Sequence, residues 1–254
     1  MRRIFITGAS TGIGAALARH YAGPDTEIGL FARRRDLLEQ LAAGLPGRSA
    51  IYPADITDVT AVSAAAQDFI ARFGAPDLVI ANAGISIGTH GDELQDVDKL
   101  RRVLDVNVAG LAATLAAFAP AMRNAGGGTL CGIASVAGLR GVPGAGAYSA
   151  SKAAAISWLE SLRTELAGSG VSVVTICPGY IDTPMTQVNK YAMPFIISAE
   201  DAAQRFARAI AAKRRLVVIP WQMAIVSTLL RALPGWLYDR LAARAPRKPR
   251  DVAI

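Results

Sequence analysis

Short apolar runs alternate with amphipathic, helix-like stretches along most of this 254-residue chain. The apolar runs are rich in β-branched residues, as buried strands are, and they lie at 4–7, 27–32, 50–52, 78–81, 129–133, 171–177 and 216–219. The connections are short, and no linker or repeat divides the chain. This order predicts an α/β fold: one doubly wound, Rossmann-like parallel sheet of about seven strands, with helices on both faces, in a single domain.

A glycine-rich turn follows the first predicted strand and leads into a helix. Residues 7–14 read TGASTGIG, and apolar residues with helical spacing continue through Leu17 to Tyr21. Glycines at such a turn let the backbone approach a pyrophosphate, whose charge faces the helix N-terminus. Glycine turns before helices also occur for packing reasons, so the motif indicates a dinucleotide site only together with other features.

The end of the second predicted strand bears on the choice of cofactor. In dinucleotide-binding folds this strand end meets the adenosine ribose, where an acidic residue binds the 2′-hydroxyl of NAD. Here Ala32 occupies the position, and Arg33, Arg34 and Arg35 follow it. An arginine fork suits a 2′-phosphate, so the sequence predicts NADP(H) rather than NAD(H). The alternative is that these arginines are solvated residues at the start of a helix.

Tyr148 and Lys152 form the strongest candidate for catalytic chemistry. Four residues separate them, so on a helix their side chains share one face. An ammonium beside a phenol favours the phenolate, so we expect Lys152 to lower the pKa of Tyr148. Ser135 follows a predicted strand, and the Gly- and Pro-rich stretch after it could bring the hydroxyl to the phenol. Taken alone, the Tyr–Lys pair could equally be a solvated helix face.

Polar and turn residues stand at the carboxyl ends of several predicted strands. They are Gly8, Asp55, Asn82, Ser135 and Pro178. Ligands of doubly wound sheets bind at this edge, so we expect these residues to converge on one site. Asn107 lies inside an apolar helical pattern at 98–124, where asparagine is unfavourable, and it is therefore either buried with partners or part of a site.

Composition excludes several other classes of protein. The only two cysteines, Cys131 and Cys177, lie in apolar runs, which predicts buried thiols, no disulfide, no metal site and a reducing compartment. The N-terminal apolar run is too short for a signal peptide, and no run of eighteen apolar residues predicts a transmembrane helix. We therefore expect a cytoplasmic protein. The basic clusters lack interleaved aromatic residues, so nucleic-acid binding is not expected.

Several motifs, taken in order, resemble the short-chain dehydrogenase/reductase family of the roughly 250-residue type. They are TGASTGIG (7–14), ANAG (81–84), Asn107, Ser135, YSASK (148–152), and Pro178-Gly179 followed by Asp182-Thr183. The matches cover residues 1 to about 220, and ANAG stands where NNAG is commoner in the family. The resemblance implies an oxidoreductase that interconverts a carbonyl and an alcohol with a nicotinamide dinucleotide.

The resemblance also implies individual roles. Tyr148 would act as general acid, Ser135 would hold the substrate oxygen, Lys152 would bind the nicotinamide ribose, and Asn107 would distort its helix and hold a water. The implied cofactor-binding residues are Gly8, Ser10, Gly12, Ile13, Gly14, Arg33, Arg34, Asp55, Ile56, Asn82, Ala83, Gly84, Tyr148, Lys152, Pro178, Gly179, Ile181 and Thr183. The alternatives are a noncatalytic dinucleotide-binding sensor or scaffold, which would not need the Tyr–Lys pair, and, less well supported, an epimerase or dehydratase.

The family commonly forms a homodimer or homotetramer through the long helices around Asn107 and Tyr148. Apolar residues lie on more than one side of these helices, for example Leu111, Leu115, Phe118, Trp158 and Leu162. A helix that faces its own sheet would show a similar pattern.

The last third of the chain bears on substrate and location. Within the predicted catalytic region 1–220, segment 180–197 is a candidate substrate lid. Its many bulky apolar residues favour a lipophilic carbonyl or alcohol as the substrate. The alternative is that these residues only fasten the lid to the core. Residues 221–254 form a predicted helical extension with apolar faces. Its last 24 residues hold six basic and two acidic residues, +4 of the total +7. We expect the extension either to cover the cleft or a partner subunit, or to touch a membrane surface.

Overall fold

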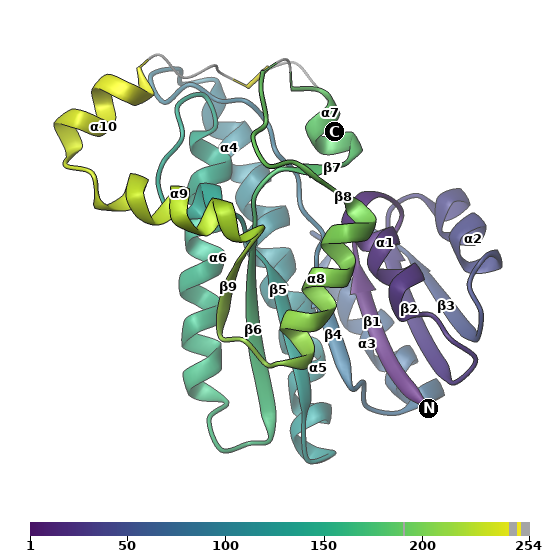
Figure 1. The fold of residues 1–254 in the computed structure, drawn as a ribbon. Coiled ribbons are helices and arrows are strands. Elements are labelled where there is room, and N and C mark those ends of the chain that lie inside the picture. The colour runs from purple at the N-terminus through teal and green to yellow at the C-terminus, as the bar shows by residue number, and fades with distance from the viewer. Residues whose placement is uncertain (190, 244–247, 250–254) are drawn as a thin grey trace.

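A computed structural model describes residues 1–189, 191–243 and 248–249. Its central sheet has seven parallel strands in the order β3-β2-β1-β4-β5-β6-β9. The strands are β1 (Arg2–Thr7), β2 (Thr26–Ala32), β3 (Arg48–Pro53), β4 (Leu78–Ala81), β5 (Gly128–Ile133), β6 (Val171–Pro178) and β9 (Leu216–Ile219). The predicted doubly wound, single-domain α/β fold is confirmed (Figure 1).

Helices cover both faces of this sheet. The helices are α1 (Gly12–Tyr21), α2 (Arg35–Ala43), α3 (Val59–Phe73), α4 (Asp96–Leu104), α5 (Gly110–Asn124), α6 (Gly146–Glu165), α7 (Pro184–Gln187), α8 (Ala199–Ala211), α9 (Trp221–Ala232) and α10 (Gly235–Ala242). One core cluster joins α1, α2 and α8 to the sheet, and a second joins α3, α5 and α6 to the opposite face. Ser198 caps the N-terminus of α8, where its hydroxyl accepts a hydrogen bond from the amide of Asp201 at 3.0 Å.

The long helical run 96–124 is apolar and long enough to cross a membrane by length and composition alone. Half of its most apolar window is buried, as in the core helix of a folded domain. Leu111, Leu115 and Phe118 are fully or almost fully buried against the chain's own sheet. These three residues therefore give no support to the dimer contact, and the oligomeric state stays a prediction.

The chain beyond β6 covers the carboxyl edge of the sheet. Two short strands, β7 (Ile181–Asp182) and β8 (Ile197–Ser198), pair with each other in the predicted lid segment, whose residue 190 lies outside the described residues. The described tail residues Lys248 and Pro249 pack against Gly88, where an added Cβ would lie 2.5 Å from the Pro249 carbonyl oxygen. Residues 244–247 and 250–254, which hold three of the six basic residues of the C-terminal segment, are outside the described residues as well.

Arg140 fastens the C-terminal helices to the loop between Ser135 and α6. Its guanidinium lies 3.9 Å from the centre of the Tyr238 ring. It also donates to carbonyl oxygens at the end of α9, including that of Leu233 at 3.0 Å. The Tyr238 hydroxyl donates to the Gly141 carbonyl oxygen in return. The α9–α10 pair is therefore a structural support for the loop that leads to Tyr148.

Candidate active site

One cleft of about 870 Å³ runs along the carboxyl ends of the strands. It is lined by all but two of the residues predicted for catalysis and cofactor binding: Gly8, Ser10, Gly12, Ile13, Arg33, Arg34, Asp55, Ile56, Asn82, Ala83, Gly84, Ser135, Tyr148, Lys152, Pro178, Gly179, Ile181 and Thr183. The two exceptions, Gly14 and Asn107, lie just behind its wall. Strand-end placement thus brings together residues that are up to 175 positions apart in the chain, from Gly8 to Thr183.

At two glycines of the turn, the neighbouring atoms leave no room for a side chain. Gly8 has a φ of 65°, and an added Cβ would lie 2.8 Å from the Cα of Ala83. A Cβ on Gly14 would lie 2.2 Å from the Gly8 carbonyl oxygen. Thr11, at the N-cap of α1, makes no side-chain bond to the first turn. The backbone therefore forms a bare cradle at a helix N-terminus, which fits a pyrophosphate group.

Asn82 holds this cradle in place. Its side-chain amide donates to the carbonyl oxygens of Thr7 at 3.1 Å and Gly8 at 3.3 Å. Its backbone amide donates to the Thr7 hydroxyl at 3.1 Å. Asn82 therefore joins the ends of β1 and β4, and a contact with the adenosine-side ribose stays a prediction.

Positive charge gathers at the adenosine end of the cleft. Arg34 donates to the hydroxyls of Ser10 and Thr11, both at 3.2 Å. Burial alone would raise the pKa of Asp55, but bonds from Thr57 and the charges of Arg33 and Arg102 lower it below its usual value. Arg102, on α4, also lines the cleft. Arg102 was not predicted as a site residue, because its helix is distant in the chain and joins the site only through the fold.

At the other end, Ser135, Tyr148 and Lys152 meet. Ser135 and Tyr148 both line the cleft, close enough for the Ser135 side chain to oppose the rise that burial causes in the pKa of Tyr148. The Lys152 ammonium lies 5.7 Å from the centre of the Tyr148 ring and donates to the Ile133 carbonyl oxygen at 2.8 Å. Lys152 is only 4% exposed, and burial lowers its pKa to about 8. The ammonium thus stays charged at neutral pH inside a poorly solvated site.

The pKa of Tyr148 shifts in the direction opposite to the prediction. Burial raises it, the Ser135 side chain opposes the rise, and the charge of a deprotonated Cys177 would add to it. The expectation that Lys152 lowers this pKa was wrong for the net shift, because burial removes water from the charged phenolate. A raised pKa keeps the phenol protonated at neutral pH, which is the form that can donate a proton.

Asn107 lies in a π-helical turn (Asp105–Ala109) that separates α4 from α5. The distortion implied by the family resemblance is therefore present. Its side chain is fully buried and saturated by partners: it accepts from the Ile85 amide at 2.8 Å, and donates to the Ile85 carbonyl at 2.9 Å and the Ser151 hydroxyl at 2.9 Å. A Cβ on Gly84 would lie 3.2 Å from the Asn107 oxygen and 3.5 Å from the Lys152 nitrogen. Asn107 thus fixes the loop after β4 close to Lys152.

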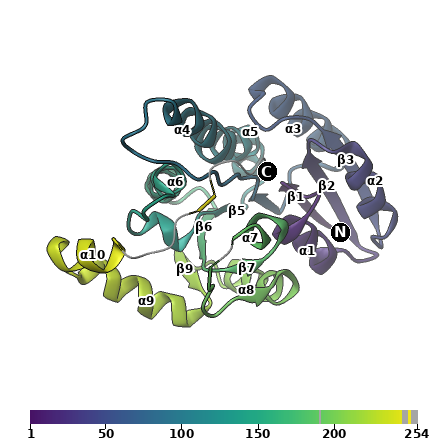
Figure 2. The same cartoon turned by 90° about the horizontal axis from the view of Figure 1, so that it is seen from above.

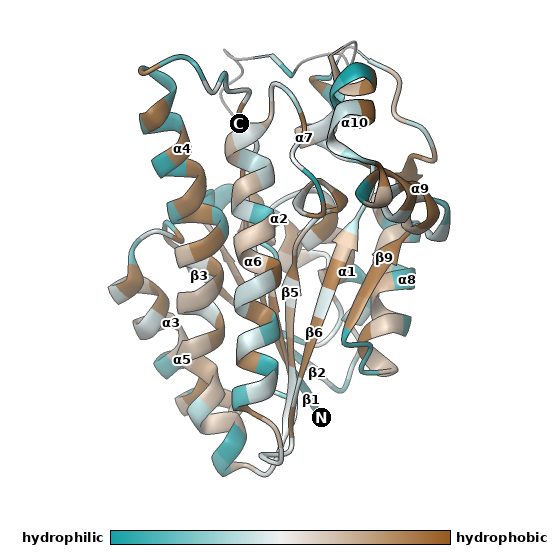
Figure 3. Ribbon diagram, turned by 90° about the vertical axis from the view of Figure 1, so that its left-hand side faces the viewer, coloured by the Kyte–Doolittle hydropathy of each residue, from teal (hydrophilic) through white to brown (hydrophobic). Residues whose placement is uncertain are grey.

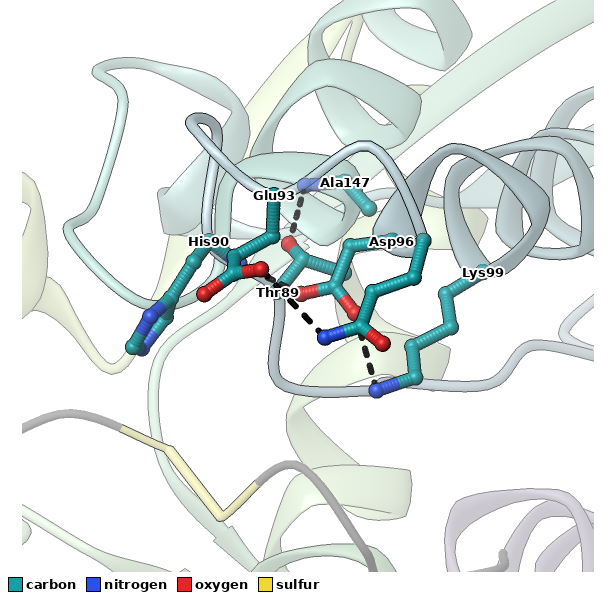
Figure 4. Close-up of polar contacts among 7 residues, drawn as sticks. Thr89, His90, Glu93, Asp96, Lys99 and Ala147 are labelled. Carbon is teal, nitrogen blue, oxygen red and sulfur yellow. Dashed lines mark hydrogen bonds and ion pairs between the residues drawn. The ribbon is translucent and has the colours of Figure 1, made fainter.

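A second buried network positions the start of the catalytic helix. Thr89 accepts from the Ala147 amide at 3.1 Å, one residue before Tyr148, and its own amide donates to the Gly144 carbonyl at 3.0 Å. Asp96, 3% exposed, accepts from the amide of His90 at 2.8 Å and pairs with Lys99 at 2.9 Å (Figure 4). No motif in the sequence indicated Thr89 or Asp96, since their partners are loop amides that only the fold brings near.

Replacing Thr89 by Val tests this network. The Val side chain keeps the shape but leaves the buried Ala147 amide without its acceptor, which costs about 1–3 kcal/mol. In a chain of this size we expect the melting temperature to fall by about 2–4 °C per kcal/mol. The matched control is Thr164→Val, which removes an exposed hydroxyl bonded to the Ser161 carbonyl. Equal melting temperatures for the two variants would contradict the role given to Thr89.

A model of the short chain dehydrogenase family matches residues 2–193. The chain belongs to the short-chain dehydrogenase/reductase family. The predicted resemblance is thereby confirmed. Short-chain dehydrogenases/reductases are oxidoreductases that act on CH–OH and C=O groups, and their fold binds NAD(P)(H).

Individual members of the family align over most of this short-chain dehydrogenase/reductase. An uncharacterized oxidoreductase of Myxococcus xanthus is 36% identical over 96% of this chain and 97% of its own. A 2-(R)-hydroxypropyl-CoM dehydrogenase of Xanthobacter autotrophicus is 34% identical over 73% of this chain and 77% of its own. A solved alcohol dehydrogenase of Thermococcus sibiricus, complexed with 5-hydroxy-NADP, has a TM-score of 0.75 and 27% identity, with 86% of this chain and 96% of that chain covered.

Proposed function

We propose that this protein is an NADP(H)-dependent reductase of lipophilic ketones or aldehydes, which also runs in the reverse direction as an alcohol dehydrogenase. The observation that carries the proposal is the Tyr148 hydroxyl. It lies near the Ser135 side chain and beside the buried Lys152 in the cleft that holds the glycine cradle.

In the proposed reduction, the substrate oxygen lies between the Ser135 and Tyr148 hydroxyls. Ser135 donates a hydrogen bond to the carbonyl oxygen, and Tyr148 gives its proton to the same oxygen as the carbon is reduced. A reduced nicotinamide dinucleotide supplies the hydride when bound. Lys152 supplies positive charge beside the ring, and this charge stabilises the phenolate that Tyr148 becomes when it gives up its proton.

The proposed preference for NADP(H) rests on the adenosine end of the cleft. Ala32 provides no carboxylate for a ribose 2′-hydroxyl, whereas Arg33 and Arg34 line the cleft beside it. Arg34 reaches across to Ser10 and Thr11 of the glycine turn. Two guanidinium groups at this place suit a 2′-phosphate.

Arg33→Ala tests the cofactor choice. A charge-assisted hydrogen bond contributes about 1.5–3 kcal/mol, so we expect NADPH to bind about ten- to a hundredfold more weakly while NADH is unaffected. The matched control is Arg35→Ala, since Arg35 pairs with Glu39 at 3.6 Å, is highly exposed and is not among the cleft residues. Dissociation constants from fluorescence titration provide the measurement. Equal use of both cofactors by the wild type would overturn the proposed preference.

The lipophilic substrate is proposed from the lid segment. Met185 and Val188 line the cleft, and Tyr191 lies near Tyr148. Tyr180 and Tyr191 are in edge contact with ring centres 6.5 Å apart. These side chains offer apolar surface and few charges next to the proposed proton donor, which suits a carbonyl with hydrocarbon on both sides. The Xanthobacter autotrophicus relative, named for a secondary alcohol, supports a ketone as the oxidised partner.

A screen of steroids, 3-oxoacyl esters, long-chain ketones and small dicarbonyls with NADPH tests the function. We expect steady-state oxidation of NADPH with at least one apolar carbonyl. The competing hypothesis, a noncatalytic sensor or scaffold, predicts tight NADPH binding with no turnover of any carbonyl in the panel. Turnover restricted to charged sugars or acids would contradict the lipophilic substrate while leaving the family assignment intact.

A further inference from the structure

Helices α9 and α10 each expose large apolar side chains. Trp221, Ile225 and Leu229 follow one another at four-residue intervals, so they lie along one side of α9, and their exposed fractions are 65%, 52% and 63%. Trp236 and Leu241 on α10 are 71% and 55% exposed. A folded domain normally buries or scatters such residues, and a gathered set marks a contact surface.

This pair lies at the edge of the molecule near the cleft. Helix α9 begins directly after β9, at the carboxyl edge of the sheet, and α10 extends outward from it (Figures 1 and 2). Apolar stretches colour both helices in Figure 3. Other exposed apolar residues belong to loops at the same sheet edge, namely Leu94, Phe195 and Ile196. Two separate parts of the chain therefore bring exposed apolar groups to one end of the molecule.

Basic residues accompany the apolar face. Arg231 and Arg240 are exposed at the ends of α9 and α10, with Asp239 as the single exposed acidic residue of the pair. In the sequence, Arg244, Arg247, Arg250 and Asp251 follow outside the described residues, whereas Lys248 is buried against Gly88 and adds no charge to this face. Tryptophan next to exposed basic residues is typical of surfaces that lie in the headgroup region of a membrane.

We propose that the α9–α10 face docks on the surface of a membrane with anionic lipids. A second copy of this chain fits the face less well. A twofold contact would place the same patch against itself, and so bring one basic segment against another. An anionic lipid surface complements that charge and takes up the tryptophan, leucine and isoleucine side chains at the same time. Docking by this face would leave the edge of the cleft near the lipid. The docking proposal does not depend on the identity of the substrate.

Cosedimentation with vesicles tests the proposal on the full-length protein. The probes are phosphatidylcholine vesicles with and without phosphatidylserine, at low and high salt. We expect binding to the phosphatidylserine vesicles at low salt, weakened at high salt by screening. The double variant Trp236→Ser/Leu241→Ser should bind at least about tenfold more weakly, since each large apolar side chain contributes to burial in the interface. The control Leu216→Thr alters another exposed apolar residue, 47% exposed, at the start of β9 on the opposite edge of the sheet.

Circular dichroism and NADPH binding confirm that the variants fold, because all three substituted side chains are exposed. A blue shift of tryptophan fluorescence on adding vesicles should accompany binding of the wild type. Lack of vesicle binding at low salt would overturn the proposal, and so would equal binding by the double variant. Loss of self-association in the double variant, without vesicle binding by the wild type, would instead identify a second copy of the chain as the occupant of this face.

Discussion

Tyr148→Phe should reduce kcat by at least about 100-fold, the usual contribution of a positioned general acid. The change removes one hydroxyl and keeps the ring, so the packing beside Lys152 is retained. NADPH should still bind, since the glycine cradle and the arginines at the far end of the cleft are untouched. Steady-state kinetics on the best substrate, together with a fluorescence titration of NADPH, would measure both quantities.

Removal of the hydroxyl from another tyrosine controls for general effects of a Tyr→Phe substitution. Tyr52 donates a hydrogen bond to Asp68 at 2.8 Å and is not a cleft residue. Tyr52→Phe should therefore leave kcat unchanged. Near-normal turnover by Tyr148→Phe would exclude Tyr148 as the proton donor.

Lys152→Met should abolish most activity and yet make the protein more stable at neutral pH. Burial lowers the pKa of Lys152 from 10.5 to about 8. A displacement of this size corresponds to roughly 3 kcal/mol of destabilisation by the buried charge. Methionine fills similar space without charge but leaves the Ile133 carbonyl without its donor, which costs about 1–3 kcal/mol. The net gain is therefore about 1 kcal/mol, a rise in melting temperature of about 2–4 °C.

The stability difference between the wild type and Lys152→Met should depend on pH. Below the folded-state pKa of about 8, the lysine is charged in both states, and the folded state bears the cost of burying it. Between about 8 and 10.5 the unfolded chain binds more protons, so wild-type stability from this group rises with pH. The advantage of Lys152→Met should thus shrink between pH 7 and about pH 9.5. A lower melting temperature for the variant at pH 7 would contradict the destabilising role of the buried ammonium.

Features that depend on local pattern and chain order could be predicted from the sequence. The seven strands are visible as apolar runs, because central parallel strands are buried on both faces. The convergence of Gly8, Asp55, Asn82, Ser135 and Pro178 follows from parallel strands alone, since their carboxyl ends share one edge of the sheet. The distortion at Asn107 was implied only by the family resemblance.

Features that depend on burial and on distant partners could not be predicted. The pKa of Tyr148 is set by how completely the fold removes water, and a four-residue spacing to Lys152 does not report this. Arg102, Thr89 and Arg140 act through contacts with loops that are remote in the chain. The apolar residues of α5 and α9 looked alike in the sequence, but the structure buries Leu115 and exposes Leu229.

Transfer of deuterium tests the central claim most directly. The enzyme would be incubated with a lipophilic ketone and NADPH deuterated at C4 of the nicotinamide ring, in each of the two stereochemical forms. We predict that one form gives an alcohol with deuterium on its carbinol carbon, and that Tyr148→Phe slows formation of this product at least about 100-fold. Mass spectrometry of the product provides the readout. Tight NADPH binding with no labelled alcohol from any ketone, aldehyde or oxoester would contradict the proposed reductase.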